Sequence, residues 1–151
     1  MKTEKEKFMT LALKEADKAE QKEEVPIGCV IVKDGKVVAK AHNLKQTKRL
    51  ATAHAEILAI NKACRKLKDW RLDDYEIYVT LEPCAMCAGA IASARMKKAY
   101  FGAYEPKGGG VTSKFDILSE SGLNHVTEFE GGVMEKECSE KIKGFFRARR
   151  K

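Results

Sequence analysis

The spacing of hydrophobic residues changes from helical to strand-like early in the chain. Thr3 and Glu6 fit a helix-capping box, and apolar residues then recur three or four positions apart as far as about Gln21, which predicts an amphipathic helix. Two short apolar runs follow, at residues 27–32 and 37–39, and the Asp-Gly pair between them is typical of a hairpin turn. The chain is therefore predicted to open with a helix and a β-hairpin.

The centre of the chain carries its most apolar segments. Residues 43–51 are polar and basic and predict a loop, after which Thr52 is the expected cap of a helix from His54 to about Leu67. The first turns of this helix are apolar nearly all round, which predicts that it is buried. A β-rich apolar run at residues 75–81 then predicts a strand.

The remaining segments continue this alternation. We expect a helix at 84–95, a strand at 98–102, a glycine-rich loop at 106–110, a short helix at 115–119, a strand at 125–129 and a last helix from about Met134. Strands that alternate with helices indicate an α/β sandwich, in which helices cover both faces of the sheet. No repeat or linker interrupts the pattern, so residues 1–151 are predicted to form a single domain.

Composition narrows the class of protein and its compartment. Apolar residues make up 44% of the chain, which is a globular composition, and the absence of a run of about 18 apolar residues excludes a transmembrane helix. The five cysteines show no disulfide-scaffold pattern, which favours a reducing cytoplasm. The 29 basic residues outnumber the 22 acidic ones, and the net charge of +7 suits a polyanionic partner without proving one.

Two closely spaced thiols, Cys84 and Cys87, stand directly behind the strand predicted at residues 75–81. Pro83 suits the first turn of a helix, so both thiols are expected to project from one side of that turn. The helix dipole and the free amide groups there favour thiolate, which is the form that binds zinc. By itself the pair fits a redox motif, a structural zinc site or a catalytic zinc site.

The predicted buried helix supplies residues that complete a metal site. His54 stands at its start, and Glu56 is a charged residue in a segment otherwise too apolar to face water, where a carboxylate without a purpose is costly. If His54, Cys84 and Cys87 bind Zn²⁺, three protein ligands leave a fourth position open for a catalytic water. Glu56 is then placed to take a proton from that water and pass it on.

Several stretches of the chain resemble the bacterial tRNA-specific adenosine deaminases, a family of the cytidine deaminase superfamily of zinc deaminases. They are His54-Ala55-Glu56 with Pro83-Cys84-Ala85-Met86-Cys87, which is the zinc deaminase signature, and residues 24–28, 41–43, 80–84, 86–90, 124–125 and 145–147. Together they cover nearly the whole chain. The resemblance implies a cytidine deaminase-like, three-layer α/β/α sandwich with a mixed five-stranded sheet, and a homodimer.

The resemblance also implies a reaction. Members of the family convert the wobble adenosine of a tRNA anticodon to inosine by hydrolytic deamination, and ammonia is released. Water activated by one Zn²⁺ per subunit attacks C6 of the base, while Glu56 is expected to protonate N1 and then the leaving amine. The adenosine must be splayed out of its loop to enter the site, which costs little in an anticodon that is already single-stranded.

Four residues match positions that hold the base in this family. Asn43 resembles the residue that hydrogen-bonds the purine ring, and the backbone of Ala55 is expected beside it. Pro26 and Ile27 resemble the apolar wall of the base pocket. The resemblance therefore predicts that these residues surround the metal site.

RNA contacts are expected in one loop and at the C-terminus. Glu105 stands where the family commonly has Asp at the start of an Asp-Pro-Lys loop, and Lys107 ends that loop. The C-terminal segment adds an aromatic residue and three arginines that fit base stacking and phosphate contacts, Phe146, Arg147, Arg149 and Arg150. The alternative for these charges is a solvated, fraying terminus.

Two other functions share part of these features. A deaminase of a free base such as guanine or cytosine would share Glu56 and the three ligands, but a small substrate needs no polycationic C-terminus. A non-catalytic RNA-binding subunit that keeps zinc structurally would have no use for Glu56 as a proton carrier. Deamination of adenosine in tRNA is therefore the leading prediction.

Overall fold

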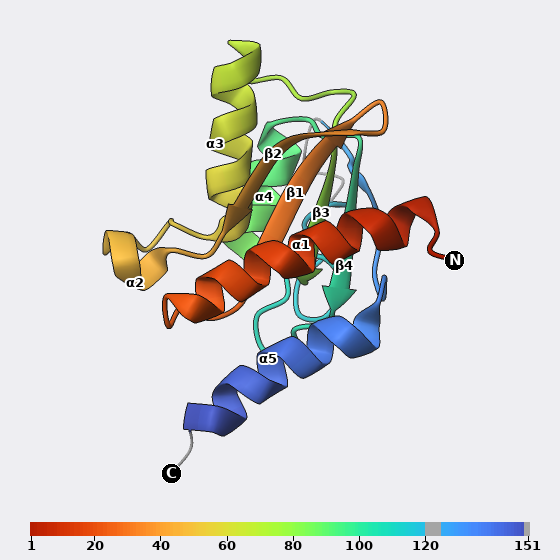
Figure 1. Cartoon of the computed structure of the whole chain (residues 1–151). Coiled ribbons are helices and arrows are strands. Elements are labelled where there is room, and N and C mark those ends of the chain that lie inside the picture. The colour runs from red at the N-terminus through yellow and green to blue at the C-terminus, as the bar shows by residue number, and fades with distance from the viewer. Residues whose placement is uncertain (120–124, 150–151) are drawn as a thin grey trace.

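The computed structural model of the chain describes residues 1–119 and 125–149 (Figure 1). Its elements are α1 (Glu4–Gln21), β1 (Gly28–Lys33), β2 (Lys36–His42), α2 (Lys45–Lys48), α3 (Ala55–Leu67), β3 (Glu76–Leu81), α4 (Ala85–Ser93), β4 (Lys98–Ala103), β5 (Glu128–Glu130) and α5 (Glu135–Arg149). They form an α/β/α sandwich around one sheet, which confirms the predicted fold class.

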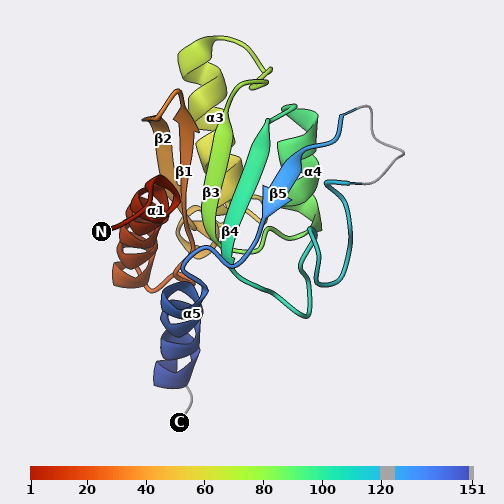
Figure 2. The ribbon, with the colours of Figure 1, turned by 90° about the vertical axis from the view of Figure 1, so that its right-hand side faces the viewer.

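The sheet is mixed and five-stranded, in the order β2-β1-β3-β4-β5 (Figure 2). Strand β1 is antiparallel to β2 and β3, whereas β3, β4 and β5 are parallel. In this register Gly28 pairs with His42, and Cys29 pairs with Val79. The start of β1 and the C-terminal ends of β2, β3 and β4 therefore lie at the same end of the sheet. Open α/β sheets bind their ligands beyond the C-terminal ends of their strands.

Alternate residues of each strand pack into two separate hydrophobic cores, because successive side chains point to opposite faces of a sheet. One core contains Ile31, Ile77 and Phe101, which pack with buried residues of α3 and α4. The other contains Tyr78 and Tyr100, whose rings stack at a centroid distance of 4.3 Å, together with residues of α1 and α5. Helices α3 and α4 thus cover one face and α1 and α5 the other, as Figures 1 and 2 show.

Two glycines allow α1 and α5 to lie directly on the sheet. A Cβ atom at Gly28 would overlap the backbone of α1 at Ala12 and Ala16, and one at Gly102 would overlap the side chain of Cys138 in α5. Only glycine fits such close approaches. The five cysteines are free thiols.

The main helices and strands lie where the hydrophobic pattern predicts them, but two local predictions were wrong near the site. Residues 45–48 form the helix α2 instead of a loop. Its amides at Gln46 and Thr47 donate to the buried carboxylate of Glu24, at N···O distances of 3.1 and 2.6 Å. Because Glu24 is far away in sequence, local composition does not reveal this cap. The predicted cap of α3 at Thr52 is also wrong, since the N-cap is His54, whose side chain makes no capping bond.

Further differences concern the ends of elements. Pro83 precedes α4 instead of forming its first turn, because Cys84 occupies the N-cap position. Residues 115–119 form no helix, since the amides of Phe115 and Ile117 bond back to the carbonyls of Gly109 and Gly110. The strand predicted from residue 125 begins only at Glu128. In the described part of the chain no helix has the length and apolarity needed to cross a bilayer.

Candidate active site

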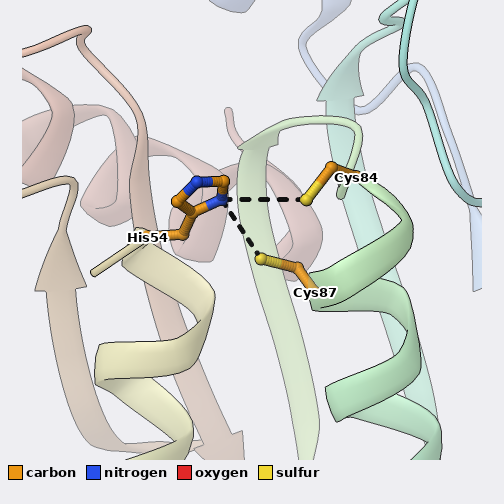
Figure 3. A group of neighbouring side chains, drawn as sticks. All are labelled: His54, Cys84 and Cys87. Atoms are coloured by element: carbon orange, nitrogen blue, oxygen red, sulfur yellow. Dashed lines mark hydrogen bonds between the residues drawn. The ribbon is translucent and has the colours of Figure 1, made fainter. Parts of the chain in front are cut away.

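The structure brings His54, Cys84 and Cys87 together at this end of the sheet (Figure 3). His54 lies at the N-terminal end of α3, and the two cysteines lie at the N-terminal end of α4. The Nδ1 atom of His54 lies 3.7 Å from Sγ of Cys84 and 3.5 Å from Sγ of Cys87. Tetrahedral zinc with bonds of about 2.0–2.1 Å to nitrogen and about 2.3 Å to sulfur separates such ligands by about 3.6 Å. Both the donor set and its spacing therefore fit a Zn²⁺ ion with one position left open.

Hydrogen bonds within this group favour the metal-binding thiolate at Cys84, whereas the hydrogen bond that Cys87 donates to Cys84, together with burial, raises the pKa of Cys87. The pKa of Cys84 is lowered to about 3, because its sulfur accepts hydrogen bonds from Cys87 and from His54. The same bond to Cys84 raises the pKa of His54. A metal cation bound here would replace the protons that these hydrogen bonds share. It would then be held by the thiolate and by the neutral imidazole.

Glu56 lies in the first turn of α3, and its side chain is buried beside His54, Cys84 and Cys87. Burial, which disfavours the charged carboxylate, raises the pKa of Glu56 to about 7. A carboxyl group that titrates near neutral pH both accepts and donates protons under ordinary conditions. Glu56 thus has the position and the proton affinity of a general acid and base.

A cavity of about 390 Å³ opens above this group, within the range of roughly 300–1,000 Å³ that is common for small-molecule sites. It is lined by Ile27, His54, Glu56, Leu81, Glu82, Cys84, Glu105, Lys107 and Gly108. A second cavity of about 230 Å³ shares four of these residues, Ile27, His54, Leu81 and Glu105. The two cavities therefore form one continuous groove.

The residues expected around the base divide into two groups. Asn43, Ala55 and Ile27 line the groove, whereas Pro26 is buried and lines neither cavity. The amide group of Asn43 donates to the carbonyl of Val25 at 3.3 Å, and its oxygen accepts from the N–H of Lys45 at 3.1 Å. These bonds fix the orientation of the Asn43 side chain and leave one amide hydrogen and one lone pair for a further partner.

The residues expected to contact RNA extend this groove outward along α5. Glu105 and Lys107 line a third cavity of about 600 Å³, and Phe146, which is 44% exposed, lines both this cavity and the second. Arg147 is exposed on the same helix. Arg149 instead folds back, with its guanidinium carbon 3.6 Å from the ring centroid of Phe145, and Arg150 lies outside the described residues.

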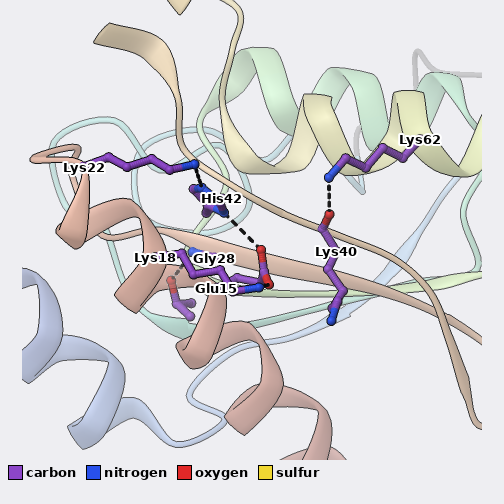
Figure 4. Close-up of polar contacts among 8 residues, drawn as sticks. Glu15, Lys18, Lys22, Gly28, Lys40, His42 and Lys62 are labelled. Atoms are coloured by element: carbon purple, nitrogen blue, oxygen red, sulfur yellow. Dashed lines mark hydrogen bonds and ion pairs between the residues drawn. The ribbon is translucent and has the colours of Figure 1, made fainter. Parts of the chain in front are cut away.

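A polar cluster supports the end of β2, immediately before Asn43 (Figure 4). Nδ1 of His42 lies 3.0 Å from the buried carboxylate of Glu15, and Nε2 lies 3.0 Å from Nζ of Lys22. Lys18 adds an ion pair to Glu15 at 2.8 Å. The cluster ties β2, which Asn43 directly follows, to helix α1.

Sequence reasoning missed several residues of the groove. Leu81 lines all three cavities and Lys143 lines the third. Glu82 lines the first although it is almost fully buried. The signal for Glu82 was its place as a carboxylate directly after a buried strand, whereas Glu56 was noticed as a charged residue in an apolar helix.

Comparisons with known proteins agree with this geometry. The sequence model of the MafB19-like deaminase family matches residues 3–150. The chain is 49% identical over 149 residues to the tRNA-specific adenosine deaminase of Bacillus subtilis strain 168, covering 99% of this chain and 92% of that protein. It is also 48% identical over 143 residues to the tRNA-specific adenosine deaminase of Aquifex aeolicus strain VF5, covering 95% and 94%.

One solved structure, from work on A-to-I editing by tRNA:A34 deaminases at the wobble position of transfer RNA, superposes with a TM-score of 0.87 at 45% identity. The match covers 89% of this chain and 98% of that one. The family model and the level of identity over nearly the whole length agree with the sequence motifs. The chain belongs to the family of tRNA-specific adenosine deaminases.

Proposed function

We propose that the protein deaminates adenosine to inosine at the wobble position of a tRNA anticodon. Membership of the family makes this the expected reaction, since the relatives are tRNA-specific adenosine deaminases. The observation that carries the proposal is the position of Glu56, which is buried beside one histidine and two thiols at the floor of a cavity. A proton carrier next to an open metal position is what hydrolytic deamination requires.

His54, Cys84 and Cys87 are proposed to hold one Zn²⁺. Bound there, zinc would supply Lewis-acid activation of water near neutral pH. The three side chains come from helix ends that are anchored to the sheet, so the ligand set is held before metal binds. Metal analysis of the purified protein tests this step, with about one zinc per chain as the expected result.

Glu56 is proposed to carry both protons of the attacking water, the first to N1 of the base and the second to the departing amine. Its elevated pKa suits both halves of this task. Ile27 and Leu81 provide apolar walls for the ring, and Asn43, which lines the second cavity, has hydrogen-bonding capacity left for the base. These residues would hold the adenine with C6 toward the metal position.

The outer part of the groove is proposed to bind the anticodon loop. Phe146 offers an exposed ring for a neighbouring base, and Lys107 and Lys143 line the same cavity, where they can neutralise phosphates. A free purine would use only the inner cavity. The aromatic and basic residues of α5 therefore favour an RNA substrate over a free base.

A deaminase of free guanine or cytosine is the competing function. A solved guanine deaminase from Nitrosomonas europaea superposes with a TM-score of 0.81 but only 20% identity, and that likeness shows the fold alone. Ammonia release should therefore be measured from free adenine, guanine and cytosine and from an anticodon stem-loop with adenosine at the wobble position. We expect release from the stem-loop only, and activity confined to free bases would overturn the proposal.

The resemblance also leads us to propose a homodimer that acts in the cytoplasm, where its tRNA substrate is found. The mass of the zinc-loaded protein in solution, measured by light scattering, tests the first point. Twice the mass of the chain is the expected result, and the mass of one chain would contradict it.

A further inference from the structure

Glu82 is a buried carboxylate that the proposed chemistry does not use. It directly follows β3, its residue is only 2% exposed, and it lies two positions before Cys84. Within residues 1–119 and 125–149, no lysine, arginine or histidine forms an ion pair with it. A buried carboxylate without a cationic partner must instead be stabilised by hydrogen-bond donors.

The donors to Glu82 all come from one segment, residues 105–113. Oε1 accepts hydrogen bonds from the backbone N–H of Glu105 at 3.0 Å and from the hydroxyl of Ser113. Oε2 accepts from three consecutive amides, those of Val111, Thr112 and Ser113, at 3.2, 2.8 and 2.9 Å. Consecutive amides that converge on one oxygen form an anion-binding nest, and here the anion is part of the protein itself.

Backbone contacts tie the middle of this segment to the same place. The amide of Gly110 donates to the carbonyl of Pro83 at 2.7 Å, and Gly109 forms an isolated β-bridge with Cys84. Gly109 also packs so closely on the carboxylate of Glu82 that an added Cβ atom would overlap it. Residues 82–84 thus hold segment 105–113 along its length.

We propose that Glu82 is a positioning residue that fixes segment 105–113 as one wall of the active-site groove. Glu105, Lys107 and Gly108 of this segment line the cavity above Glu56. The oxygens of Glu82 are occupied by donors of segment 105–113, so Glu82 acts on the substrate through this wall. The inference deepens the proposed function and rests on it, because the wall matters for the substrate that the groove binds.

The variant Glu82→Gln tests this role while keeping the size of the side chain. Its amide nitrogen cannot accept a hydrogen bond, so at least two of the donors lose their acceptor. We expect KM for the anticodon stem-loop to rise about tenfold while kcat changes less than about threefold, because the substrate-binding wall loosens and the chemistry remains. Zinc content should stay unchanged, and hydrogen exchange should accelerate at the amides of residues 105 and 111–113.

Thr127→Val is the matched control for loss of a buried hydrogen bond. Thr127 is 1% exposed and donates to the carbonyl of Met96 at 2.9 Å, next to the start of β4 and therefore at the opposite end of that strand from the groove. We expect this control to lower thermal stability without a change in KM. An equal rise in KM in the control, or an unchanged KM and unchanged exchange in Glu82→Gln, would overturn the proposal.

Ser113→Ala keeps the test decisive if Glu82→Gln does not fold. This variant removes a single donor, so KM should rise about twofold and exchange should accelerate only within residues 105–113. No change in either quantity would overturn the role of Glu82. If the unmodified protein does not act on the stem-loop, the proposed function fails, whereas the exchange data still decide whether Glu82 fixes the segment.

Discussion

The inner and outer parts of the groove are built in different ways. In the inner part, His54, Cys84, Cys87 and Glu56 sit at helix ends packed against the sheet, and Glu56 is buried. In the outer part, Phe146 and its charged neighbours project from the last helix with large exposed surfaces. The inner part therefore has fixed geometry before any substrate arrives, whereas the outer part offers charge and an aromatic surface.

Under the proposed function, the inner part performs the chemistry and the outer part selects the substrate. A free base and an RNA base need the same metal ligands and the same proton carrier, so the inner part does not distinguish them. Phosphates and neighbouring bases can be recognised only outside it. Changes in the inner part should therefore affect the rate constant of deamination, and changes in the outer part should affect binding of RNA.

The largest expected effect is on the proton carrier. Glu56→Gln keeps the shape of the side chain but removes its ability to accept a proton, so kcat should fall by roughly 10³-fold or more. Zinc content should remain near one ion per chain, because Glu56 is not a proposed ligand. Both quantities can be measured on one preparation, by deamination of the stem-loop and by metal analysis.

Cys87→Ser is the companion variant for this experiment. It removes a proposed ligand, so zinc and activity should be lost together, in contrast to Glu56→Gln. Full activity in Glu56→Gln would remove Glu56 from the mechanism. Loss of zinc in both variants would mean that Glu56 helps to hold the metal.

A second prediction concerns the buried framework around the inner part. Burial raises the pKa of Glu24, but hydrogen bonds from Thr47 and Gln46 lower it more, so the net pKa lies below the usual 4.5. A carboxylate with a depressed folded-state pKa stabilises the protein above the unfolded-state value, and this contribution is lost as pH falls through the folded-state value. Acid should therefore weaken the anchor of α2 below about pH 4.5.

Glu24→Gln should lower the free energy of unfolding at pH 7 by about 1–3 kcal/mol, because buried amides lose a charged acceptor. Below pH 4.5 the free energy of unfolding should fall less steeply in the variant than in the unmodified protein. The stability curves of the two proteins should therefore converge in acid. Glu23→Gln, an exposed neighbour, is the control and should change neither quantity. Urea denaturation across this pH range checks the prediction, and parallel curves for Glu24→Gln and the unmodified protein would contradict it.

The third prediction addresses the outer part. Phe146→Ala removes the exposed ring at the mouth of the groove and should weaken binding of the stem-loop about tenfold, the lower range of a stacking contact. The kcat at saturating RNA should stay within about twofold, since the inner part is untouched. Phe115→Ala is a control, because Phe115 is also exposed but lines none of the three cavities. Equal losses in both variants would argue against stacking on Phe146.

The smallest expected effect is electrostatic. Changing Arg147 and Arg149 to Gln should weaken RNA binding a few-fold and reduce the slope of log affinity against log salt by about 1–2, through lost phosphate contacts. Arg149 already contacts Phe145, so the larger share should come from Arg147. Lys136→Gln, at the other end of α5, should leave the slope unchanged. An unchanged slope in the double variant would mean that these arginines belong to a solvated terminus and do not contact phosphates.

The features that could be predicted from sequence are those that neighbouring residues determine. The capping box of Thr3 and Glu6 forms as expected, with reciprocal bonds between the two residues. The Asp-Gly hairpin and the alternation of strands and helices also held, because hydrophobic spacing is a local property. The grouping of His54 with Cys84 and Cys87 followed from a motif that places each ligand at the start of a helix.

What could not be predicted depends on partners that are distant in sequence. Helix α2 forms where Glu24 caps its amides, and the amides of residues 111–113 turn toward the carboxylate of Glu82. In each case a buried polar group determines the local backbone conformation, and the segment that it binds can be identified only in the folded structure.

The central claim is that this groove converts a tRNA adenosine to inosine. Sequencing of tRNA from cells with the protein, without it, and with Glu56→Gln in its place tests this claim most directly. We predict inosine at the wobble position only when the unmodified protein is present. Inosine at that position in all three samples, or in none of them, would contradict the account.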